Sequence, residues 1–478
     1  MAPARTTLVW FRRDLRLQDN RVLTAALARG GPVIPFFLLE ERMDRGTAGE
    51  WWLGRSLESL NRDLLAKRSR LIIRQGETAA VLRSLISETG ATAVLWDESF
   101  EPAQRKIDEK VRVALRGAGI FCDAVSDSLL YDPRRIRNKQ GTPFKVFTPF
   151  WNHCLSLEEP ASPVRLSGDL PAPSSWPSSD KIGVWSPGPR KEWTQKIAGS
   201  WTPGEKSAGS HLEKFLSGPL LDYPLGRDHP ATEGTSKLSP FLHFGEISPR
   251  QVWHETRRRM AECRRPGALR AAEAFLRQLV WREFARHMLF HFPEMVSMPL
   301  HKEFLKFSWR KEGHLLRAWR KGETGYPLVD AGMRQLWATG WMHNRVRMIA
   351  ASLLVKDMLQ PWQEGAAWFM ETLVDADLAN NAFGWQWVAG CGADAAPYFR
   401  IFNPVLQGIR FDPRGAYTRR WVPELSKLPD RYIHRPWEAS PGILAAAGVR
   451  LDKNYPSPVV DHDAGRKRAL LAYSRMKK

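Results

Sequence analysis

The sequence predicts an α/β N-terminal domain, with a Rossmann-like parallel sheet and helices on both of its faces, followed by an all-α C-terminal domain. Three observations support this fold class. Up to about residue 130, short apolar runs alternate with amphipathic stretches, as in repeated strand–helix–strand units. Residues 157–203 are rich in Pro, Ser and Gly. Beyond residue 204, apolar residues recur with helical spacing.

Five apolar runs in the N-terminal region are predicted to be strands: residues 7–11, 32–39, 70–76, 92–98 and 119–125. The amphipathic stretches between them, such as WWLGRSLESLNRDLLAK, are predicted to be helices. The first strand runs into FRRDLRL rather than into G-x-G-x-x-G, the usual dinucleotide-binding turn of such sheets. A nucleotide is therefore expected to bind elsewhere in the chain.

The segment between the two domains is predicted to be a connector that lies over the surface. Its composition cannot bury enough apolar surface to form a core of its own. We place the α/β domain at 1–131, the connector at 132–205 and the helical domain at 206–478. Within the helical domain, Ser248 followed by Pro249 is typical of a helix start.

The net charge of the chain is unusual for a globular protein. It has 71 Lys and Arg against 51 Asp and Glu, a formal charge of +20. This charge suits a polyanion such as nucleic acid, although a general basic bias would give the same value. The four cysteines are far apart and the histidines lack H-E-x-x-H spacing, so we expect no disulfide framework and no metal site. We also expect no signal peptide and no membrane span, hence a cytoplasmic protein.

Two stretches of the C-terminal half combine residues suited to binding a cofactor. GTSKLSP, at 234–240, offers hydroxyls and amides for a phosphate, although such clusters are most often plain loops. RQLVWRE, at 277–283, places Gln278, Trp281 and Arg282 on one helix face. That face suits a planar heterocycle, or else a core Trp with polar neighbours at its rim.

Two further stretches bring charged, amide and aromatic side chains together. In GWMHNRVRM, at 340–348, Asn344 and Met348 share a helix face beside two arginines, which suits a base-sized ligand next to phosphates. A lone Met on a helix is more often a core residue. DADLANNAFGWQW, at 375–387, adds acids for hydroxyls and ring N–H groups, an amide for a redox-active ring nitrogen, and indoles that can pass an electron.

These stretches also carry a family resemblance. LVWFRRDLRLQDN, GTSKLSPFLHFGEISPRQVW, WREF, TGWMHNRVRMIAASLLVKD and DADLANNAFGWQW…DAAPYFRIFNPVLQG resemble, in order and over nearly the whole chain, the photolyase/cryptochrome family. MHNR…M and LANN…GWQW look like the branch that repairs cyclobutane pyrimidine dimers, of class I or class III type. The resemblance implies light-dependent repair of UV-damaged DNA by electron transfer from photoexcited FADH⁻. It further implies a monomer without metal, associated with the bacterial nucleoid through DNA.

The resemblance assigns roles to individual residues of this chain. It implies FAD binding by Tyr223, Thr235, Ser236, Lys237, Leu238, Ser239, Arg282, Asn344, Arg347, Asp375, Ala376, Asp377 and Asn381. It implies contact with the lesion or the DNA by Arg227, Gln278, Trp281, Asn344, Arg345, Met348, Trp387, Arg400 and Gln407. Electron transfer to the flavin would run through Trp309, Trp362 and Trp385, while Asn381 and Gln278 would face the reacting groups.

Two features depart from the family pattern. Dimer photolyases of this type usually have Glu at the position of Gln278; Gln is usual in (6-4) photolyases and animal cryptochromes. Those proteins typically carry His where this chain has Asn344 and Met348. A cryptochrome-type photoreceptor or a (6-4) photolyase is therefore the alternative function. Ala103 and Gln104 do not match the Asn-Glu pair of many folate-binding members. The implied antenna chromophore is still methenyltetrahydrofolate, with a deazaflavin or an empty site as alternatives.

Overall fold

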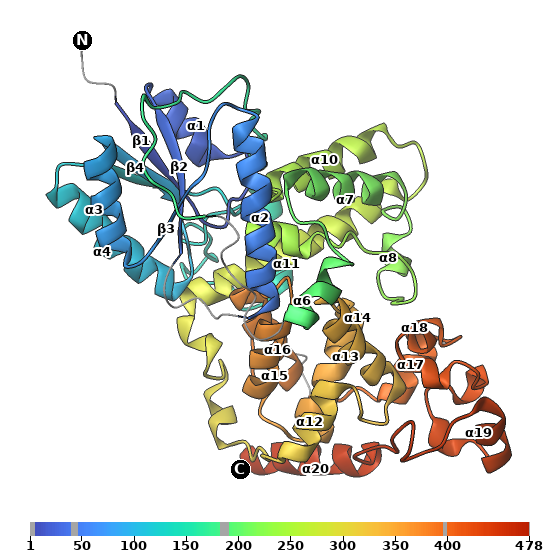
Figure 1. Ribbon diagram of the computed structural model, residues 1–478. Coiled ribbons are helices and arrows are strands. Elements are labelled where there is room, and N and C mark those ends of the chain that lie inside the picture. Colours follow the sequence, from blue (N-terminus) through green and yellow to red (C-terminus); the bar gives the residue numbers. More distant parts are fainter. Residues whose placement is uncertain (1–4, 40–45, 182–190, 395–398, 478) are drawn as a thin grey trace.

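The computed structural model describes residues 5–39, 46–181, 191–394 and 399–477, and shows an α/β part followed by a helical part (Figure 1). Five parallel strands form one sheet in the order β3-β2-β1-β4-β5. Their bounds are β1 Thr7–Phe11, β2 Val33–Leu39, β3 Ile72–Gln75, β4 Ala93–Asp97 and β5 Phe121–Val125. Each strand lies within a run that the sequence predicts to be a strand, and the predicted fold class is confirmed.

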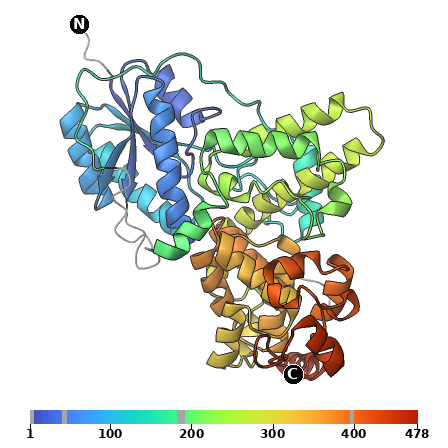
Figure 2. The same ribbon diagram turned by 45° about the vertical axis from the view of Figure 1, so that its right-hand side comes forward.

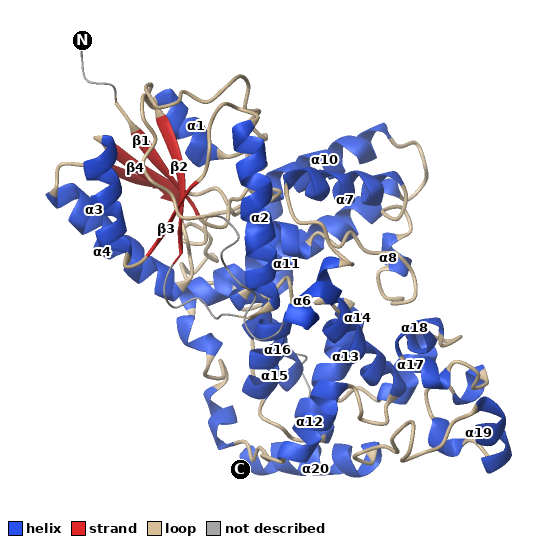
Figure 3. Ribbon diagram, viewed as in Figure 1, coloured by secondary structure: helices blue, strands red, loops and turns tan. Residues whose placement is uncertain are grey.

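Helices cover both faces of the sheet (Figure 3). They are α1 Arg21–Ala28, α2 Ala48–Leu65, α3 Thr78–Thr89 and α4 Pro102–Gly117. Successive residues of a strand point to opposite faces. Accordingly, Val9 packs in the core with α1 and α2, whereas Leu8 packs in the core with α3 and α4. From β1 the chain adds β2 and β3 on one side of the sheet, and it then adds β4 and β5 on the other side. Open sheets of this kind bind ligands where the strand order reverses, at the carboxyl ends of the strands.

The predicted connector contains two helices, α5 Phe147–Ser156 and α6 Lys191–Ala198. Between them, its extended part passes over the α/β part (Figure 2). There Pro171 accepts a backbone hydrogen bond from Val33 at 2.8 Å, and Leu170 donates one to Lys67 at 3.1 Å. Backbone pairing of this kind holds the segment along the edge of the α/β part.

The described chain beyond the connector is helical, apart from an isolated bridge between Leu451 and Tyr455. Its α-helices are α7 Glu205–Ser217, α8 Tyr223–Gly226, α9 Ser239–Phe244, α10 Pro249–Glu262, α11 Ala268–His291, α12 Gly313–Lys321, α13 Pro327–Thr339, α14 Asn344–Ser352, α15 Trp362–Thr372, α16 Leu378–Ala389, α17 Pro404–Phe411, α18 Ala416–Trp421, α19 Pro441–Ala447 and α20 His462–Met476. Short 3-10 helices are formed by Pro293–Val296, Lys302–Lys306, Pro423–Leu425, Asp430–Tyr432 and Pro436–Glu438, and a π-helix is formed by Leu353–Asp357.

Two helix starts show how local sequence sets these elements. As predicted, Ser248 caps α10: its hydroxyl accepts from the Gln251 backbone N–H at 2.9 Å, and the Gln251 side chain accepts from the Ser248 N–H at 2.8 Å. Asp377 caps α16 by accepting from the Asn380 backbone N–H at 2.9 Å. Such a cap contributes about 1 kcal/mol. In α16 it also fixes the orientation of an acid at the functional site.

The α/β and helical parts share one hydrophobic core. Phe241 of α9 packs in the same buried cluster as residues of α1 and α2. Trp52 of α2 donates its indole N–H to Glu246 at 3.0 Å, and the buried Arg250 pairs with Asp127 at 2.5 Å. These contacts hold α9 and α10 against the α/β part.

Among the described residues, no helix combines the length and the apolar character needed to cross a membrane.

Candidate functional site

The helical part contains a cavity of about 540 Å³, which we call the helical cavity. This volume suits a large organic ligand. Helices α11, α14 and α16 supply much of its wall. The sequence-predicted site residues that line it are Arg227, Gln278, Trp281, Asn344, Arg347, Met348, Asp375, Ala376, Asp377, Asn381, Trp385, Trp387 and Arg400. Stretches that are far apart in the sequence therefore meet at one place.

One wall of the helical cavity has an unused hydrogen-bond acceptor. Arg347 donates from Nη2 to Oδ2 of Asp375 at 2.9 Å. The other carboxylate oxygen of Asp375, Oδ1, is buried and has no hydrogen-bond partner among the residues that the structure describes. Leaving a buried polar group unpaired costs about 1–3 kcal/mol, and more for a charged one. A ligand with an N–H or O–H donor at this point would therefore be favoured.

Asp377 is held by groups on two helices. Its Oδ2 accepts from Arg286 of α11 at 2.6 Å and lies 3.5 Å from Nδ1 of His243 on α9. Burial alone would raise the pKa of Asp377, but Arg286, the His243 hydrogen bond and the Asn380 N–H hold it well below its usual value. Asp377 is thus a carboxylate at neutral pH.

Two amide side chains of the cavity are oriented by hydrogen bonds. Asn381 donates from Nδ2 to the Ala366 carbonyl at 3.0 Å, which leaves its Oδ1 free to accept. Gln278 accepts at Oε1 from Nη2 of Arg227 at 3.1 Å, which leaves its Nε2–H groups free to donate. The cavity therefore presents an acceptor from α16 and a donor from α11.

Aromatic side chains also line the cavity. Trp281 stacks on Phe147 of α5, with ring centroids 3.6 Å apart and planes 8° from parallel. Trp387 donates its indole N–H to the Asp394 carbonyl at 2.9 Å. Both indoles are therefore fixed in place, and flat fixed rings suit stacking against bases.

Trp385 is buried where α15 and α16 meet. Its ring packs edge-on against Phe369, with centroids 5.0 Å apart. It also fills the space beside Gly365, where an added Cβ would lie 2.0 Å from Cη2 of the indole. Trp362 lies one helical turn before Gly365 on α15 and is buried, whereas Trp309 is only partly buried. The predicted order of these tryptophans, from inside to outside, is compatible with this difference in burial.

The other predicted binding residues lie outside the cavity lining: Tyr223, Thr235, Ser236, Lys237, Leu238, Ser239, Arg282, Arg345 and Gln407. Thr235 and Lys237 line a separate polar cavity of about 330 Å³. Arg345 pairs with Asp228 at 2.7 Å.

Arg282, which the sequence predicts to share a helix face with Gln278 and Trp281, is not among the residues that line the helical cavity. It is buried, pairs with Glu283 at 2.9 Å and donates to the carbonyls of Ser128 at 3.2 Å and Leu242 at 3.3 Å. Burial, together with the nearby Arg286, lowers the pKa of Arg282 to about 10. Its contact with FAD stays a prediction.

Several residues of the site were missed by sequence reasoning. Asn380, Phe383 and Gly384 line the cavity, and their spacing from Asp377 along α16 is a signal that would have found the first and last of them. His243 and Arg286 contact Asp377 from distant parts of the chain, so sequence spacing gives no sign of them.

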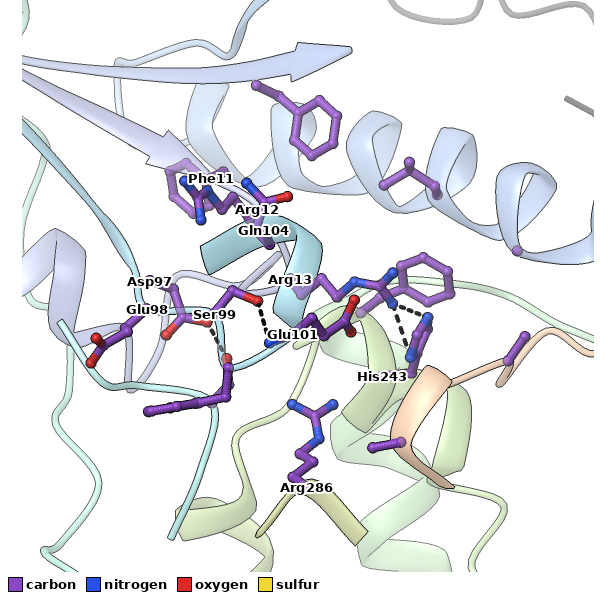
Figure 4. Close-up of a pocket in the computed structure, with 18 of the residues that line it drawn as sticks. Phe11, Arg12, Arg13, Asp97, Glu98, Ser99, Glu101, Gln104, His243 and Arg286 are labelled. Atoms are coloured by element: carbon purple, nitrogen blue, oxygen red, sulfur yellow. Dashed lines mark hydrogen bonds between the residues drawn. The ribbon is translucent and has the colours of Figure 1, made fainter. Parts of the chain in front are cut away.

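A second cavity, of about 350 Å³, lies at the carboxyl ends of β1 and β4, and we call it the sheet-edge cavity (Figure 4). Residues after these strands line it, among them Arg13 and Glu98, together with His243 and Arg286 from the helical part. This is the place where sheets of this order bind ligands. In Figure 4, Arg13 reaches the His243 ring, and Arg286 and Glu101 lie at the same side of the cavity.

Within the described ranges, no three His, Cys, Asp or Glu side chains are grouped so that they would hold a metal ion.

Comparisons with known proteins agree with this architecture. Residues 7–169 match the family model described as DNA photolyase, and residues 275–475 match the FAD binding domain of DNA photolyase. The deoxyribodipyrimidine photo-lyase of Agrobacterium fabrum is 48% identical over 473 residues, covering 98% of both chains. Cryptochrome-1 of Arabidopsis thaliana is 38% identical over 484 residues, covering 98% of this chain and 70% of that protein.

A solved structure is also very similar. The crystal structure of a bacterial class III photolyase from Agrobacterium tumefaciens has a TM-score of 0.96 at 47% identity, covering 100% of this chain and 98% of that one. The fold and the matched domains define a flavoprotein with an α/β part and a helical FAD-binding part. The chain belongs to the DNA photolyase family.

The donors and acceptors of the helical cavity fit FAD. A flavin ring has N–H donors and carbonyl acceptors along one edge, and the Arg347–Asp375 pair presents a guanidinium beside a carboxylate oxygen that lacks a partner within the described ranges. The free Oδ1 of Asn381 offers a further acceptor, which suits a protonated ring nitrogen. Asp375, Arg347 and Asn381 would therefore hold the flavin ring.

Proposed function

We propose that this protein is a light-driven lyase that splits cyclobutane pyrimidine dimers in DNA, with FAD bound in the helical cavity. One observation carries the proposal: the cavity that offers flavin-type hydrogen bonds also presents the indoles of Trp281 and Trp387 to a second ligand. Arg227 and Arg400 line the same cavity. When bound, reduced and excited by light, FAD supplies the electron that splits the dimer.

The residues of this chain bind and orient the lesion. A dimer must leave the base stack to reach a pocket inside the protein, as enzymes of this kind require. Trp281 and Trp387 give the extruded bases two fixed indole surfaces, and stacking is worth about 1–3 kcal/mol per base. Gln278, with its oxygen occupied by Arg227, directs N–H donors at a base carbonyl. Phosphates on either side of the lesion would meet Arg227, Arg345 and Arg400.

Trp385 would donate an electron to the oxidised flavin when the flavin is excited by light. It lines the helical cavity and is buried, so its indole contacts the flavin site without contacting bulk water. Trp362 and Trp309 extend this path outward in the proposal. An indole can give up an electron to an excited oxidised flavin, and the outer indole can then be restored from solution.

The net charge of +20 supports a nucleic-acid substrate. Neutralising phosphates with Lys and Arg releases counterions, so binding to DNA should weaken steeply as salt is raised.

A cryptochrome-type photoreceptor is the second candidate. Two observations favour it: the 38% identity to a plant cryptochrome over 98% of this chain, and the neutral Gln278 at a position where dimer repair usually has an acid. A (6-4) photolyase is less well supported, because Asn344 and Met348, rather than histidines, line the cavity.

The sheet-edge cavity is the proposed place of an antenna chromophore. Methenyltetrahydrofolate is the first candidate and a deazaflavin the second. An absorption band in the purified protein that FAD does not account for, and that disappears on extraction, would support an antenna.

The test of the proposed function is to reduce the FAD fully and illuminate the protein with oligonucleotides that carry either a cyclobutane thymine dimer or a (6-4) photoproduct, with dark controls. We expect light-dependent loss of the dimer only. Repair of neither lesion by protein with fully reduced FAD would assign the chain to the cryptochromes. Repair of the (6-4) photoproduct alone would assign it to that branch.

Gln278 gives a second test at the same site. A carboxyl at this position can accept a hydrogen bond and supply a proton, whereas an amide cannot supply one. Gln278→Glu is therefore expected to raise the yield of dimer repair per absorbed photon, and Gln278→Leu, which removes the donor, is expected to lower it. An unchanged or lower yield in Gln278→Glu would show that the residue does not have this role.

A further inference from the structure

The two cavities share a wall formed by residues 375–377. Ala376 lines both cavities, and Asp377 lines the helical cavity. The two side chains that hold Asp377, His243 and Arg286, line the sheet-edge cavity instead. The acid that faces the flavin site is therefore oriented from the other side of the wall.

The Asp377 carboxylate is held, among the described residues, by its own helix and by side chains outside the lining of the helical cavity. Oδ1 accepts from the backbone N–H and from Nδ2 of Asn380, both at 2.9 Å. Oδ2 accepts from Arg286 at 2.6 Å. The Arg286 side chain is only 14% exposed, so the pair is poorly screened by solvent.

His243 adds a directed hydrogen bond to the same oxygen. Nη1 of Arg13, which follows β1, contacts both nitrogens of the ring and lies 3.0 Å from Nδ1. Nδ1 is also 3.5 Å from Oδ2 of Asp377, and a hydrogen bond to that carboxylate requires the tautomer with the proton on Nδ1. Burial, with the nearby Arg13, lowers the pKa of His243 to about 4, so the ring is neutral at pH 7 and donates without carrying charge. Arg13, in the loop after β1, thus acts on the flavin site through the imidazole of His243.

We propose that Arg286 is a positioning residue for Asp377, assisted by His243 and Arg13, so that side chains of the sheet-edge cavity control how firmly the helical cavity retains FAD. The inference rests on the proposed placement of FAD in the helical cavity. Arg286 does not itself line that cavity, and it acts by keeping Asp377 ionised and fixed.

The ionisable groups around this pair are few. Arg282 and Arg286 face Asp377 from α11, and His243 faces it from α9. Arg13 acts on His243. Two acids oppose the cations: Glu101, the residue before α4, acts on Arg286, and Glu283 acts on Arg286 and pairs with Arg282 at 2.9 Å. Arg286 is the cation in direct contact with Asp377, and it favours the charged form of the acid.

The pH dependence follows from the sign of the shift. Because the pKa of Asp377 in the folded protein is depressed, its acceptor function is present above that pKa and is lost as the pH falls through it. Removing a neighbouring cation raises the pKa, by about 1 to 3 units for an Arg in contact with an Asp. FAD should then be released at a higher pH than in the unaltered protein.

The experiment measures the fraction of FAD that stays with the protein after gel filtration at a series of pH values from about 3 to 8. The variants are Arg286→Met, Arg286→Lys and His243→Phe. The matched control is Arg259→Met. Arg259 lies on α10 and pairs with Glu213 of α7, away from Asp377. Circular dichroism of each apoprotein, followed over the same pH series, gives the pH at which the fold itself is lost.

We expect the pH midpoint of FAD release to rise by about 1 unit or more in Arg286→Met. A smaller rise is expected in Arg286→Lys, which keeps a charge, and in His243→Phe, which loses one neutral donor. Arg259→Met should match the unaltered protein. If Arg286→Met does not fold, His243→Phe carries the test.

Two results would overturn the proposal. One is a midpoint in Arg286→Met equal to that of Arg259→Met. The other is release that coincides with unfolding of the apoprotein, which would make Arg286 a support of the fold alone. The FAD content of the unaltered protein is a separate readout. Protein that retains FAD but repairs no dimer would refute the repair function and leave this inference standing.

Discussion

The two cavities differ in how their charged groups are satisfied. In the sheet-edge cavity, charged side chains pair within the protein: Arg12 with Asp108 at 2.6 Å, and Arg286 with Asp377. In the helical cavity, Asp375 keeps a buried oxygen without a partner in the described part of the chain. Burying such an atom is unfavourable unless something else supplies the hydrogen bond. Each cavity is lined by residues with such an atom, but of opposite kind: the helical cavity has the acceptor Oδ1 of Asp375, whereas the sheet-edge cavity has the donors Nε of Arg12 and Nε of Arg286.

A buried carboxylate oxygen without a partner indicates a ligand with an N–H or O–H donor, and this places the flavin chemistry in the helical cavity. The sheet places its cavity at the usual ligand-binding point of an open α/β sheet, yet its lining acts in part as a support for the neighbouring site. Fold alone would have pointed to the wrong cavity, since function must be argued from the groups that a site presents. Four substitutions test the roles assigned to the helical cavity, in order of decreasing expected effect.

The largest effect is expected from Trp385→Phe. A phenyl ring fills most of the space of the indole beside Gly365 but cannot give up an electron to the flavin. Photoreduction of oxidised FAD should fall to the level of a dark control, while chemically reduced protein should still repair. Trp10→Phe is the matched control, because Trp10 is a buried tryptophan that lines the sheet-edge cavity. Equal loss of photoreduction in both variants would contradict the assignment of Trp385.

The next effect is expected from Asp375→Asn, which keeps the shape and removes the charge. Hydrogen bonds to charged groups contribute about 1.5–3 kcal/mol. Affinity for FAD, measured by fluorescence titration of the apoprotein, should therefore fall about ten- to 150-fold. Glu98→Gln, in the sheet-edge cavity, should leave the affinity unchanged. If the two variants bind FAD alike, the helical cavity is not the FAD site.

A similar or smaller loss is expected for dimer binding in Trp387→Ala. Removing one stacking surface costs about 1–3 kcal/mol, or about five- to 150-fold in affinity. The variant should bind undamaged DNA as before, because its indole meets only extruded bases in this account. The measurement is a pair of binding curves, with dimer-containing and undamaged duplex. Equal weakening on both would show that Trp387 contacts DNA outside the lesion.

The smallest effect is expected from Arg345→Ala. Arg345 pairs with Asp228 at 2.7 Å, so part of its charge is already compensated. If Arg345 contacts a phosphate, its removal should reduce the slope of log K against log salt by about one and should weaken binding similarly for all DNA sequences. An unchanged slope would remove Arg345 from the DNA-binding surface.

The sequence predicted the fold well because the signals were local. The strands of the sheet read as apolar runs flanked by amphipathic helices, and Ser248 with Pro249 gave a recognisable helix start. Much of the cavity lining was also predicted, since residues such as Asp377, Asn381 and Trp385 recur at helical spacing within one stretch.

The sequence was less informative where partners are distant in the sequence. Helical spacing groups Arg282 with Gln278 and Trp281, but in the fold Arg282 donates to the carbonyls of Ser128 and Leu242. His243 and Arg286 were missed for the same reason: their importance depends on which atom of Asp377 they reach in the folded chain. No local spacing encodes such contacts.

The most direct test of the central claim is the fluorescence lifetime of the reduced flavin in the protein, measured with and without bound DNA. If the helical cavity holds FAD and lesion together, binding of a dimer-containing oligonucleotide should shorten the lifetime, and an undamaged oligonucleotide should not, because only the dimer accepts an electron. The same lifetime with both oligonucleotides, under conditions where both are bound, would contradict the claim.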